Sequence, residues 1–545
     1  MTNDRGDQKS AFLSEGTKRD KGKDAQRLNI LVAKAVSNSI KSTLGPRGMD
    51  KMLVDEMGSV TISNDGATIL KEMAIEHPVG KMLVELAKTQ DDEVGDGTTT
   101  AVIIAGELLS KAENLLEENI HPSIIIRGYK IASRKCIEYF EEVASTITIK
   151  DKEKLLDIAK TSVTGKASDY DFSLAELVVN AVLKISKDNS KEITKDQISV
   201  IQKIGAHLKD SKLVDGIVLD KEIVHSEMPR EINKAKIALI GSALEIKEPE
   251  TEAKIQITSP EQLQAFIDQE EAQLKKMVNY IIKSGANIVV CQKGIDDLAQ
   301  HYLAKSGIMA IRRVKQSDIE KLAKATDAKI VSRISEITSK DLGSASKVYE
   351  KKISGDSLIF FEDCKNPNTI TIILRGSSEQ VLAETERTIN DAIGAVLSSL
   401  KCGKFVSAGG SAEIEVALKL RDFAKTIGGR EQLAIEAFSD VLEVIPKTLA
   451  ESAGLDAIDT IVSLRSKHQN PKNKYIGIDV INACLVDMKE KKIIEPLSIK
   501  TQAVSAASEV CEMILRIDDI IAANSRNKGM MGGGMPPGMG GMEEM

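Results

Sequence analysis

The sequence contains no tryptophan, few aromatic residues of any kind and no closely spaced cysteines. Phe, Trp and Tyr together make up 3% of the 545 residues. Because the cysteines are isolated from one another, a disulfide framework and a Cys-x-x-Cys zinc site are both disfavoured. We expect ordinary buried thiols in a reducing, cytoplasmic compartment at Cys136, Cys291, Cys364, Cys402, Cys484 and Cys511.

Long apolar runs and an excess of positive charge are also missing. No stretch has the roughly 20 apolar residues that a membrane-spanning helix needs. Residues 1–22 lack the apolar centre of a signal peptide. The formal net charge of -7 attracts neither nucleic acid nor an anionic membrane surface. We therefore expect no nucleic-acid partner and no membrane insertion.

Several familiar catalytic motifs are absent as well. There is no Gly-Lys-[Ser/Thr] sequence, which excludes a Walker A loop. The six histidines never form His-Glu-x-x-His, and no Gly-x-Ser-x-Gly elbow occurs, so a zincin or an α/β-hydrolase is not expected. If the chain binds a nucleotide, it uses a less common cradle.

What is present indicates a multidomain α+β protein. A single hydrophobic core stops growing at roughly 250–300 residues, so this length predicts two or three domains. Apolar periodicity predicts helices near both ends of the chain and alternating strands and helices in the middle, so we expect one domain inserted into another. The expected helices span 25–43, 79–94, 98–119, 383–400, 411–427 and 503–523. The expected strands span 52–54, 60–63, 235–241, 286–292, 308–314 and 328–332, with a hairpin within 472–499.

One expected helix in the middle of the chain has clear start signals. Ser259 is a candidate N-cap, Pro260 occupies the first helical position, and Gln262 completes a capping box. The preceding polar and acidic stretch, 245–256, suggests a projection from the domain. Apolar residues then recur at helical spacing at Leu263, Phe266, Ile267, Leu274, Met277, Val278 and Ile281.

The sharpest local motif is Gly95-Asp96-Gly97-Thr98-Thr99-Thr100, between two expected helices. A helix N-terminus offers free N–H donors and partial positive charge, which suit a phosphate group. The glycines let the backbone approach closely, the threonines add hydroxyl donors, and Asp96 can hold Mg²⁺. Taken alone, the motif is about equally well explained by a tight turn with a threonine N-cap.

Three further segments carry turn chemistry that could complete such a site. They are 43–48, with Leu44-Gly45-Pro46 at a helix end; 63–66, which places Asp65 on a turn; and 407–410, where Gly409 and Gly410 precede a helix. Each is more often a plain turn when considered alone.

In combination and in this order, these segments resemble the group II chaperonins, the thermosome family. The resemblance runs from about Asp24 to Ala523. It rests on 43–53, with Arg47 where the family has lysine, and on 64–70, 95–100, 494–496 and 514–519, together with the Gly/Met-rich segment 529–545. That last segment has too little apolar bulk to pack, and we expect it to be disordered.

The resemblance implies a subunit with three domains. A mainly helical equatorial ATPase domain would comprise 24–148 and 405–528, and a small α/β intermediate hinge domain 149–218 and 371–404. An apical β/α-layered domain, 219–370, would bind substrate and carry a helical lid protrusion at about 245–283. Residues 1–23 would form a disordered tail. Like or paralogous subunits would form two stacked rings of roughly eight or nine, which enclose non-native proteins without a separate lid co-chaperonin.

The resemblance also implies roles for individual residues, with ATP and Mg²⁺ as the ligands. Asp96 corresponds to the Mg²⁺ ligand, Asp391 to the aspartate that orients the attacking water, and Asp65 to a second carboxylate at the γ-phosphate. Lys166 resembles a lysine that senses that phosphate. Phosphate contacts would come from Leu44, Gly45, Pro46, Gly97, Thr98, Thr99 and Thr100, and Gly409, Gly410 and Glu495 would border the nucleoside.

Two departures from the family pattern lie on the nucleoside side. Ala408 replaces the first glycine of a triplet, and Asn482-Ala483-Cys484 replaces a Thr-Gly-Glu-like segment. Both bear on nucleotide affinity more than on the chemistry. The main hypothesis is therefore an ATP-driven protein-folding subunit. The alternative is a structural or assembly paralogue in a mixed ring that binds nucleotide weakly.

Overall fold

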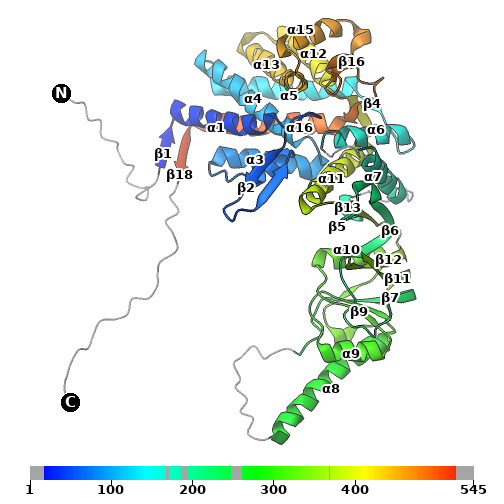
Figure 1. The fold of residues 1–545 in the computed structure, drawn as a ribbon. Helices are drawn as coiled ribbons and strands as arrows, with labels where there is room; N and C mark the ends of the chain where they lie inside the picture. The colour runs from blue at the N-terminus through cyan, green and yellow to red at the C-terminus, as the bar shows by residue number, and fades with distance from the viewer. Residues whose placement is uncertain (1–17, 167–170, 187–193, 247–259, 367–368, 523–545) are drawn as a thin grey trace, which may run out of the picture.

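The computed structural model describes residues 18–166, 171–186, 194–246, 260–366 and 369–522. It is an elongated, mixed helix and sheet structure, as the sequence predicts (Figure 1). A helical body built from both ends of the chain lies at one end, a sheet-containing part lies at the other, and a smaller layer of helices and strands connects them.

The helical body is organised around α4 (Thr98–Glu117), which is buried on most of its surface. A helix that is apolar nearly all round belongs inside a core. One continuous core joins side chains from 30–143 with side chains from 406–515, which explains why the two ends of the chain lie together. The other principal helices are α1 (Lys23–Lys41), α3 (Pro78–Val94), α5 (Pro122–Val143), α12 (Ser411–Ile427), α13 (Gly429–Leu442), α14 (Val444–Ala453), α15 (Ala457–His468) and α16 (Leu497–Leu515).

The helical body also contains short strands. The strands expected at 52–54 and 60–63 are confirmed as β2 (Lys51–Val54) and β3 (Val60–Ser63), which pair antiparallel and are followed by the short helix α2 (Gly66–Glu72). The predicted hairpin is β15 (Ile476–Asp479) with β16 (Cys484–Asp487). A three-stranded sheet contains β17 (Ile494–Pro496), β14 (Lys404–Ser407) and β4 (Ser145–Thr146).

The chain ends near residues 18 and 522 differ from expectation. The helix predicted over 503–523 ends at Leu515, and β18 (Asp519–Ala522) pairs antiparallel with β1 (Lys18–Lys21). Residues 18–23 are expected in the disordered tail, whereas residues 18–21 form β1 and Lys23 begins α1. The pairing joins segments about 500 residues apart, so local periodicity cannot reveal it. The remaining expected tail residues, 1–17 and 529–545, lie outside the described residues.

The connecting layer packs three helices against two parallel strands. The helices are α6 (Lys152–Val163), α7 (Asp171–Ile185) and α11 (Glu379–Cys402), and the strands are β5 (Ile198–Ile204) and β13 (Ile370–Gly376). Their side chains share a second core. The chain leaves this layer after β5 and returns to it at β13, and the residues between these two strands form the inserted segment. Residues from before and after that segment therefore meet here, and α11 leads directly back to the helical body.

The inserted segment continues the same sheet, which has nine strands among the described residues. The predicted strands are confirmed as β7 (Glu231–Ile240), β8 (Ile288–Cys291), β9 (Met309–Ile311) and β10 (Ile330–Val331). They pair in parallel, as helical crossovers require. The rest of this part contains β6 (Lys212–Leu219), β11 (Gly343–Ile353), β12 (Asp356–Cys364), α8 (Pro260–Ser284), α9 (Asp297–Lys305) and α10 (Gln316–Thr326).

The long helix α8 projects from this part of the molecule (Figure 1). Its two halves lie in different environments. Leu274, Val278 and Ile281 are buried in a core with the sheet, whereas Phe266 and Ile267 are 40% and 45% exposed. The expected projection therefore begins N-terminal to Leu274, and the C-terminal half of the helix belongs to the domain core. The candidate cap Ser259 and most of the acidic stretch lie outside the described residues.

Two expectations about side chains and membranes can be compared with the structure. Cys136, Cys291, Cys364 and Cys511 are buried as expected, but Cys402, the last residue of α11, and Cys484, the first residue of β16, are exposed. Among the described residues, no helix combines the length and apolar character needed to traverse a bilayer.

Candidate functional site

A cavity of about 430 Å³ opens where the helical body meets α6 and the loop after it. This volume suits a small molecule. The structure brings thirteen predicted site positions and one departure to its wall: Leu44, Gly45, Pro46, Asp65, Asp96, Gly97, Thr98, Thr99, Thr100, Lys166, Gly409, Gly410, Glu495 and Ala408. Asp391 does not line the cavity itself but bonds to Lys166, which does.

The loop between α3 and α4 has the backbone geometry that its glycines predict. Gly97 precedes α4 with φ 81°, and a Cβ atom there would lie 2.5 Å from Cγ2 of Ile499. Glycine is therefore required by conformation and by space. The N-cap residue Gly97 has no side chain to cap α4, and among the described residues no other N-cap hydrogen bond is found, so the first N–H groups of the helix are available at the cavity wall. This arrangement favours an anionic ligand.

Asp65 lies at the start of α2, where the sequence predicts a turn. Its carboxylate accepts hydrogen bonds from the backbone N–H groups of Ala67 at 3.4 Å and Thr68 at 2.8 Å, so the turn is a helix N-cap. The Thr98 hydroxyl donates to Asp65 Oδ1 at 3.0 Å. These bonds fix the carboxylate beside the first turn of α4.

Asp96 is positioned by two donors from different elements. Its Oδ1 accepts from Gly97 N at 2.7 Å, and its Oδ2 accepts from Ser162 Oγ at 2.8 Å. Gln90 Nε2 donates to its backbone carbonyl at 3.0 Å. The carboxylate is consequently held at the cavity wall in one orientation, which suits a cation ligand.

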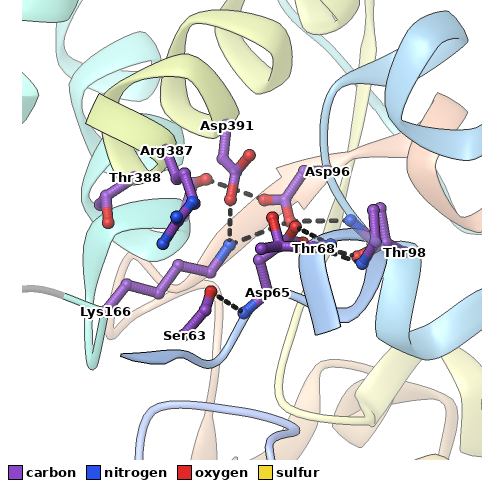
Figure 2. Close-up of polar contacts among 12 residues, drawn as sticks. Ser63, Asp65, Thr68, Asp96, Thr98, Lys166, Arg387, Thr388 and Asp391 are labelled. Atoms are coloured by element: carbon purple, nitrogen blue, oxygen red, sulfur yellow. Dashed lines mark hydrogen bonds and ion pairs between the residues drawn. The ribbon is translucent and has the colours of Figure 1, made fainter. Parts of the chain in front are cut away.

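Lys166 joins two carboxylates from separate parts of the chain and lies within electrostatic reach of a third, Asp65. Its Nζ lies 2.7 Å from Asp391 Oδ2 and 3.4 Å from Asp96 Oδ1, as Figure 2 shows, with Asp65 close by. Asp391 is only 8% exposed. The cluster brings together residues that the sequence separates by more than three hundred positions.

A backbone contact between two glycines places Asp391 in this cluster. Gly394 of α11 packs against Gly95, and a Cβ added to Gly95 would lie 2.7 Å from Cα of Gly394. Only two residues without side chains permit the helix to cross the loop this closely. Asp391, just under one turn earlier on α11, then faces Lys166.

The cluster has three carboxylates for one ammonium group, and the pKa values reflect that imbalance. Burial and the neighbouring Asp96 and Asp65 raise the pKa of Asp391 well above its usual range, although Lys166 opposes the shift. Burial lowers the pKa of Lys166, but attraction to Asp391, Asp96 and Asp65 outweighs it, and the net shift is upward. The ammonium is therefore charged, and the site retains excess negative charge that can attract a cation.

A second buried ion cluster includes Lys500 and Glu495, which also line the cavity. Lys500 Nζ is 2.5 Å from Glu413 Oε1 and 2.9 Å from Glu495 Oε1. Burial raises the pKa of Glu495 to about 7, with Glu413 adding to the shift and Lys500 opposing it. Two carboxylates again share one ammonium group, so Glu495 is poised to change its charge near neutral pH.

Arg47 connects the loop over 43–48 to the turn that contains one departure from the family pattern. Its Nη1 donates to the carbonyl of Ala453 at 3.3 Å, and its Nη2 donates to the carbonyl of Ile481 at 2.9 Å. Ala453 ends α14, where a cation is favourable. Ala483 does not line the cavity; it occupies the β15–β16 turn with φ 50°.

The structure also reveals functional candidates that the sequence reasoning did not single out. Ser162 and Lys500 line the cavity and contact predicted residues, and Asn64 has a buried Oδ1 with no hydrogen-bond partner among the described residues. Signals existed, since Ser162 is four residues before Lys166, Lys500 is five after Glu495, and Asn64 precedes Asp65. Ser162 and Lys500 belong to none of the motifs that the sequence offered, and Asn64 lies in the 64–70 motif, where Asp65 drew the attention.

Comparison with known proteins points to one family. The family model that matches residues 36–525 describes the TCP-1/cpn60 chaperonin family. The chain is 55% identical over 520 residues to thermosome subunit alpha of Archaeoglobus fulgidus, covering 95% of each chain. It is 54% identical over 541 residues to thermosome subunit beta of Methanothermobacter thermautotrophicus, covering 99% of each, and 55% identical over 529 residues to a thermosome subunit of Pyrococcus horikoshii, covering 96% of each.

Proposed function

The chain belongs to the TCP-1/cpn60 chaperonin family as a group II, thermosome-type subunit, and we propose that its cavity binds and hydrolyses ATP to drive the folding of non-native proteins. The single observation that carries the proposal is the convergence of Asp65, Asp96, Lys166 and Asp391 beside the uncapped start of α4. This set combines N–H groups that can bind an anion with more carboxylates than ammonium groups.

The donor set fits a nucleotide with Mg²⁺. The first N–H groups of α4 and the hydroxyls of Thr99 and Thr100 suit phosphate oxygens, and the Asp96 carboxylate is the ligand type that Mg²⁺ prefers. The unpartnered Asn64 Oδ1 is a further buried polar atom that a ligand can satisfy. Mg²⁺ would neutralise charge on the phosphates when bound. Leu44, Gly45 and Pro46 would contact the phosphates, and Gly409, Gly410 and Glu495 would border the nucleoside.

Asp391 is the proposed group that orients the attacking water and accepts its proton. Its carboxylate is nearly buried and held by Lys166, so it is positioned rather than free in solvent. Its raised pKa brings its basicity closer to neutral pH, which favours proton acceptance. Lys166 would carry positive charge toward the terminal phosphate, and Asp65 would supply the second carboxylate at that end of the cavity.

We also propose the domain assignments for this chain. The core shared by 30–143 and 406–515 supports an equatorial domain of 24–148 and 405–528, and the second core supports an intermediate domain of 149–218 and 371–404. Residues 219–370 would form the apical, client-binding domain. Because α11 carries Asp391 and also continues from β13, motion of the intermediate domain would couple hydrolysis to the apical domain.

The proposed assembly is two stacked rings of like or paralogous subunits in a cytoplasmic compartment, with a built-in lid in place of a separate co-chaperonin. The alternative, a structural subunit that binds nucleotide weakly, is not favoured. Ala408 lines the cavity but Ala483 does not, and the three carboxylates are all in place. The departures therefore leave the chemical end of the site intact.

The test is a phosphate-release assay on the purified assembly, combined with refolding of a chemically denatured client. We expect Mg²⁺-dependent ATP hydrolysis and an ATP-dependent gain in refolded client. Tight nucleotide binding without turnover, or turnover that has no effect on refolding, would contradict the proposal. Electron microscopy of the same preparation would determine the number of subunits in each ring.

A further inference from the structure

Two of the six histidines lie together beside α9, which Figure 1 shows in the part of the molecule farthest from the helical body. His225 is in the loop between β6 and β7, and His301 is on α9, with their ring centroids 6.2 Å apart. Glu227 completes the group. One ligand atom from each of the three side chains lies within 4.8 Å of the other two.

The backbone that presents these side chains is held in place. Met228 N donates to the carbonyl of His225 at 3.2 Å, and the buried Met228 side chain anchors this turn in the core. Val224 N donates to the carbonyl of Ala310 at 3.2 Å, which ties the loop to β9. The helix α9 buries Ala299 and Leu303 on its other side, so His301 projects from a fixed element. Little ordering is required for the three groups to act together.

The chemistry of the group favours a particular kind of cation. Two imidazoles and one carboxylate are a ligand set typical of Zn²⁺ with an open position, whereas Mg²⁺ and Ca²⁺ prefer oxygen ligands. Ligands at roughly 2.0–2.2 Å from one zinc ion lie about 3–3.5 Å apart, so small side-chain rotations must close the site. Glu227 and His301 are exposed and have this freedom. Coordination would replace the bond that Glu227 N makes to His225 Nδ1 at 3.2 Å.

We propose that His225, Glu227 and His301 form a binding site for a divalent transition metal of the zinc type. A bound ion would clamp the 224–228 loop to α9, close to the base of the projecting helix. The neighbouring residue Tyr302 bonds through its hydroxyl to Glu271 of α8, and Lys275 lies over its ring at 5.1 Å. The site would therefore stiffen the surface from which α8 extends.

The experiment uses the untagged, assembled full-length protein, stripped of metal with a chelator and free of nucleotide. Titration with Co²⁺, followed by absorption in the d–d region, and calorimetric titration with Zn²⁺ measure binding in excess Mg²⁺. We expect one saturable site per subunit. Even loss of an outer-shell partner typically costs 10–100-fold in metal affinity, so His301→Asn and Glu227→Gln should each weaken binding by at least about tenfold.

A matched control is His121→Asn, which removes an exposed histidine elsewhere and keeps a side chain able to cap α5. It should leave metal binding unchanged. Hydrogen exchange supplies a readout independent of affinity, because Zn²⁺ should slow exchange of the Val224 and Met228 amides in the parent protein but not in His301→Asn. Absence of a cobalt spectrum, or equal binding by the parent and both cluster variants, would overturn the proposal.

Discussion

Lys166 Nζ lies 2.7 Å from Asp391 Oδ2, although 225 residues separate the two in the chain. The pair links the loop after α6 to the middle of α11, and both elements belong to the connecting layer. Asp96 of the helical body lies 3.4 Å from the same ammonium group. At this contact the connecting layer and the helical body meet beside the cavity.

Asp391→Ala should leave ATP binding within a few-fold of the parent but nearly stop hydrolysis. A water-positioning or general-base group contributes roughly 10²–10⁴-fold, so the single-turnover rate should fall by about that factor. Glu379→Gln is the matched control, since it removes an exposed carboxylate from the first turn of the same helix. A single-turnover rate close to that of the parent would remove Asp391 from the mechanism.

Asp96→Ala should raise the Mg²⁺ concentration needed for half-maximal nucleotide binding and also slow turnover. The reason is that Mg²⁺ requires carboxylate and phosphate oxygens together. The control is Ser162→Ala, which removes only the hydroxyl that donates to Asp96 and should have a much smaller effect. Mg²⁺ titrations of binding and hydrolysis that superimpose for Asp96→Ala and the parent would refute this role.

Arg47→Lys should weaken ATP binding by about two- to tenfold with little change in the rate of the chemical step. A single ammonium group cannot reproduce the fork that reaches the carbonyls of Ala453 and Ile481, and one lost hydrogen bond is worth roughly 0.5–1.5 kcal/mol. Nucleotide titration and single-turnover kinetics measure the two effects separately. Arg27→Lys, at an exposed site on α1, should change neither quantity. A slower chemical step at unchanged affinity would contradict this account.

Glu495 should make stability depend on pH between about 4.5 and 7. Burial raises the pKa of Glu495 from 4.5, the value for an exposed carboxyl such as that of the unfolded chain, to about 7 in the folded chain. The folded state therefore binds the proton more tightly. The resulting stabilisation is complete below pH 4.5 and is lost as pH rises through 7. Glu495→Gln lacks this titration. Thermal melting across this range should therefore show the parent losing stability relative to the variant as pH rises.

The control for that experiment is Glu490→Gln, at an exposed position in the same segment. Its melting temperature should follow the parent at every pH. A constant difference between Glu495→Gln and the parent from pH 5 to pH 8 would show that the Glu495 pKa is not raised in the folded chain.

Two deletions distinguish the projecting half of α8 from its core half. Deletion of 248–270, bridged by a short flexible linker, keeps Glu271 and Leu274 and should preserve both the fold of the sheet that α8 packs against and ATP hydrolysis. Deletion of 248–277 also removes buried Leu274, and truncating a buried leucine to alanine alone costs about 2–5 kcal/mol. The longer deletion should therefore melt early or aggregate.

The proposed role of α8 as a lid is tested by measuring how well a bound client is protected from protease. In the presence of ATP and a transition-state mimic, a bound client should be shielded from added protease by the parent but not by the 248–270 deletion. Continued shielding of the client after the shorter deletion would rule out the lid role.

Much of the local structure follows from the sequence alone. The bounds of α3, α4 and α12 agree with the apolar periodicity and the flanking Gly and Pro residues to within two residues, because helix caps and periodicity act between near neighbours in the chain. The motif from Gly95 to Thr100 likewise predicts the start of α4 at Thr98, whereas its binding of an anion stays a prediction. Membership in the chaperonin family follows from the order of such motifs.

Only the tertiary structure decided which distant residues meet. The bond between Lys166 and Asp391 depends on the close crossing of Gly394 over Gly95, and the β1–β18 pair joins the two ends of the described chain. The division of α8 into a buried and an exposed half has the same origin, because one amphipathic pattern continues through both halves. Apolar periodicity specifies which face of a helix can be buried, but the partner that covers that face is set by packing between segments far apart in the chain.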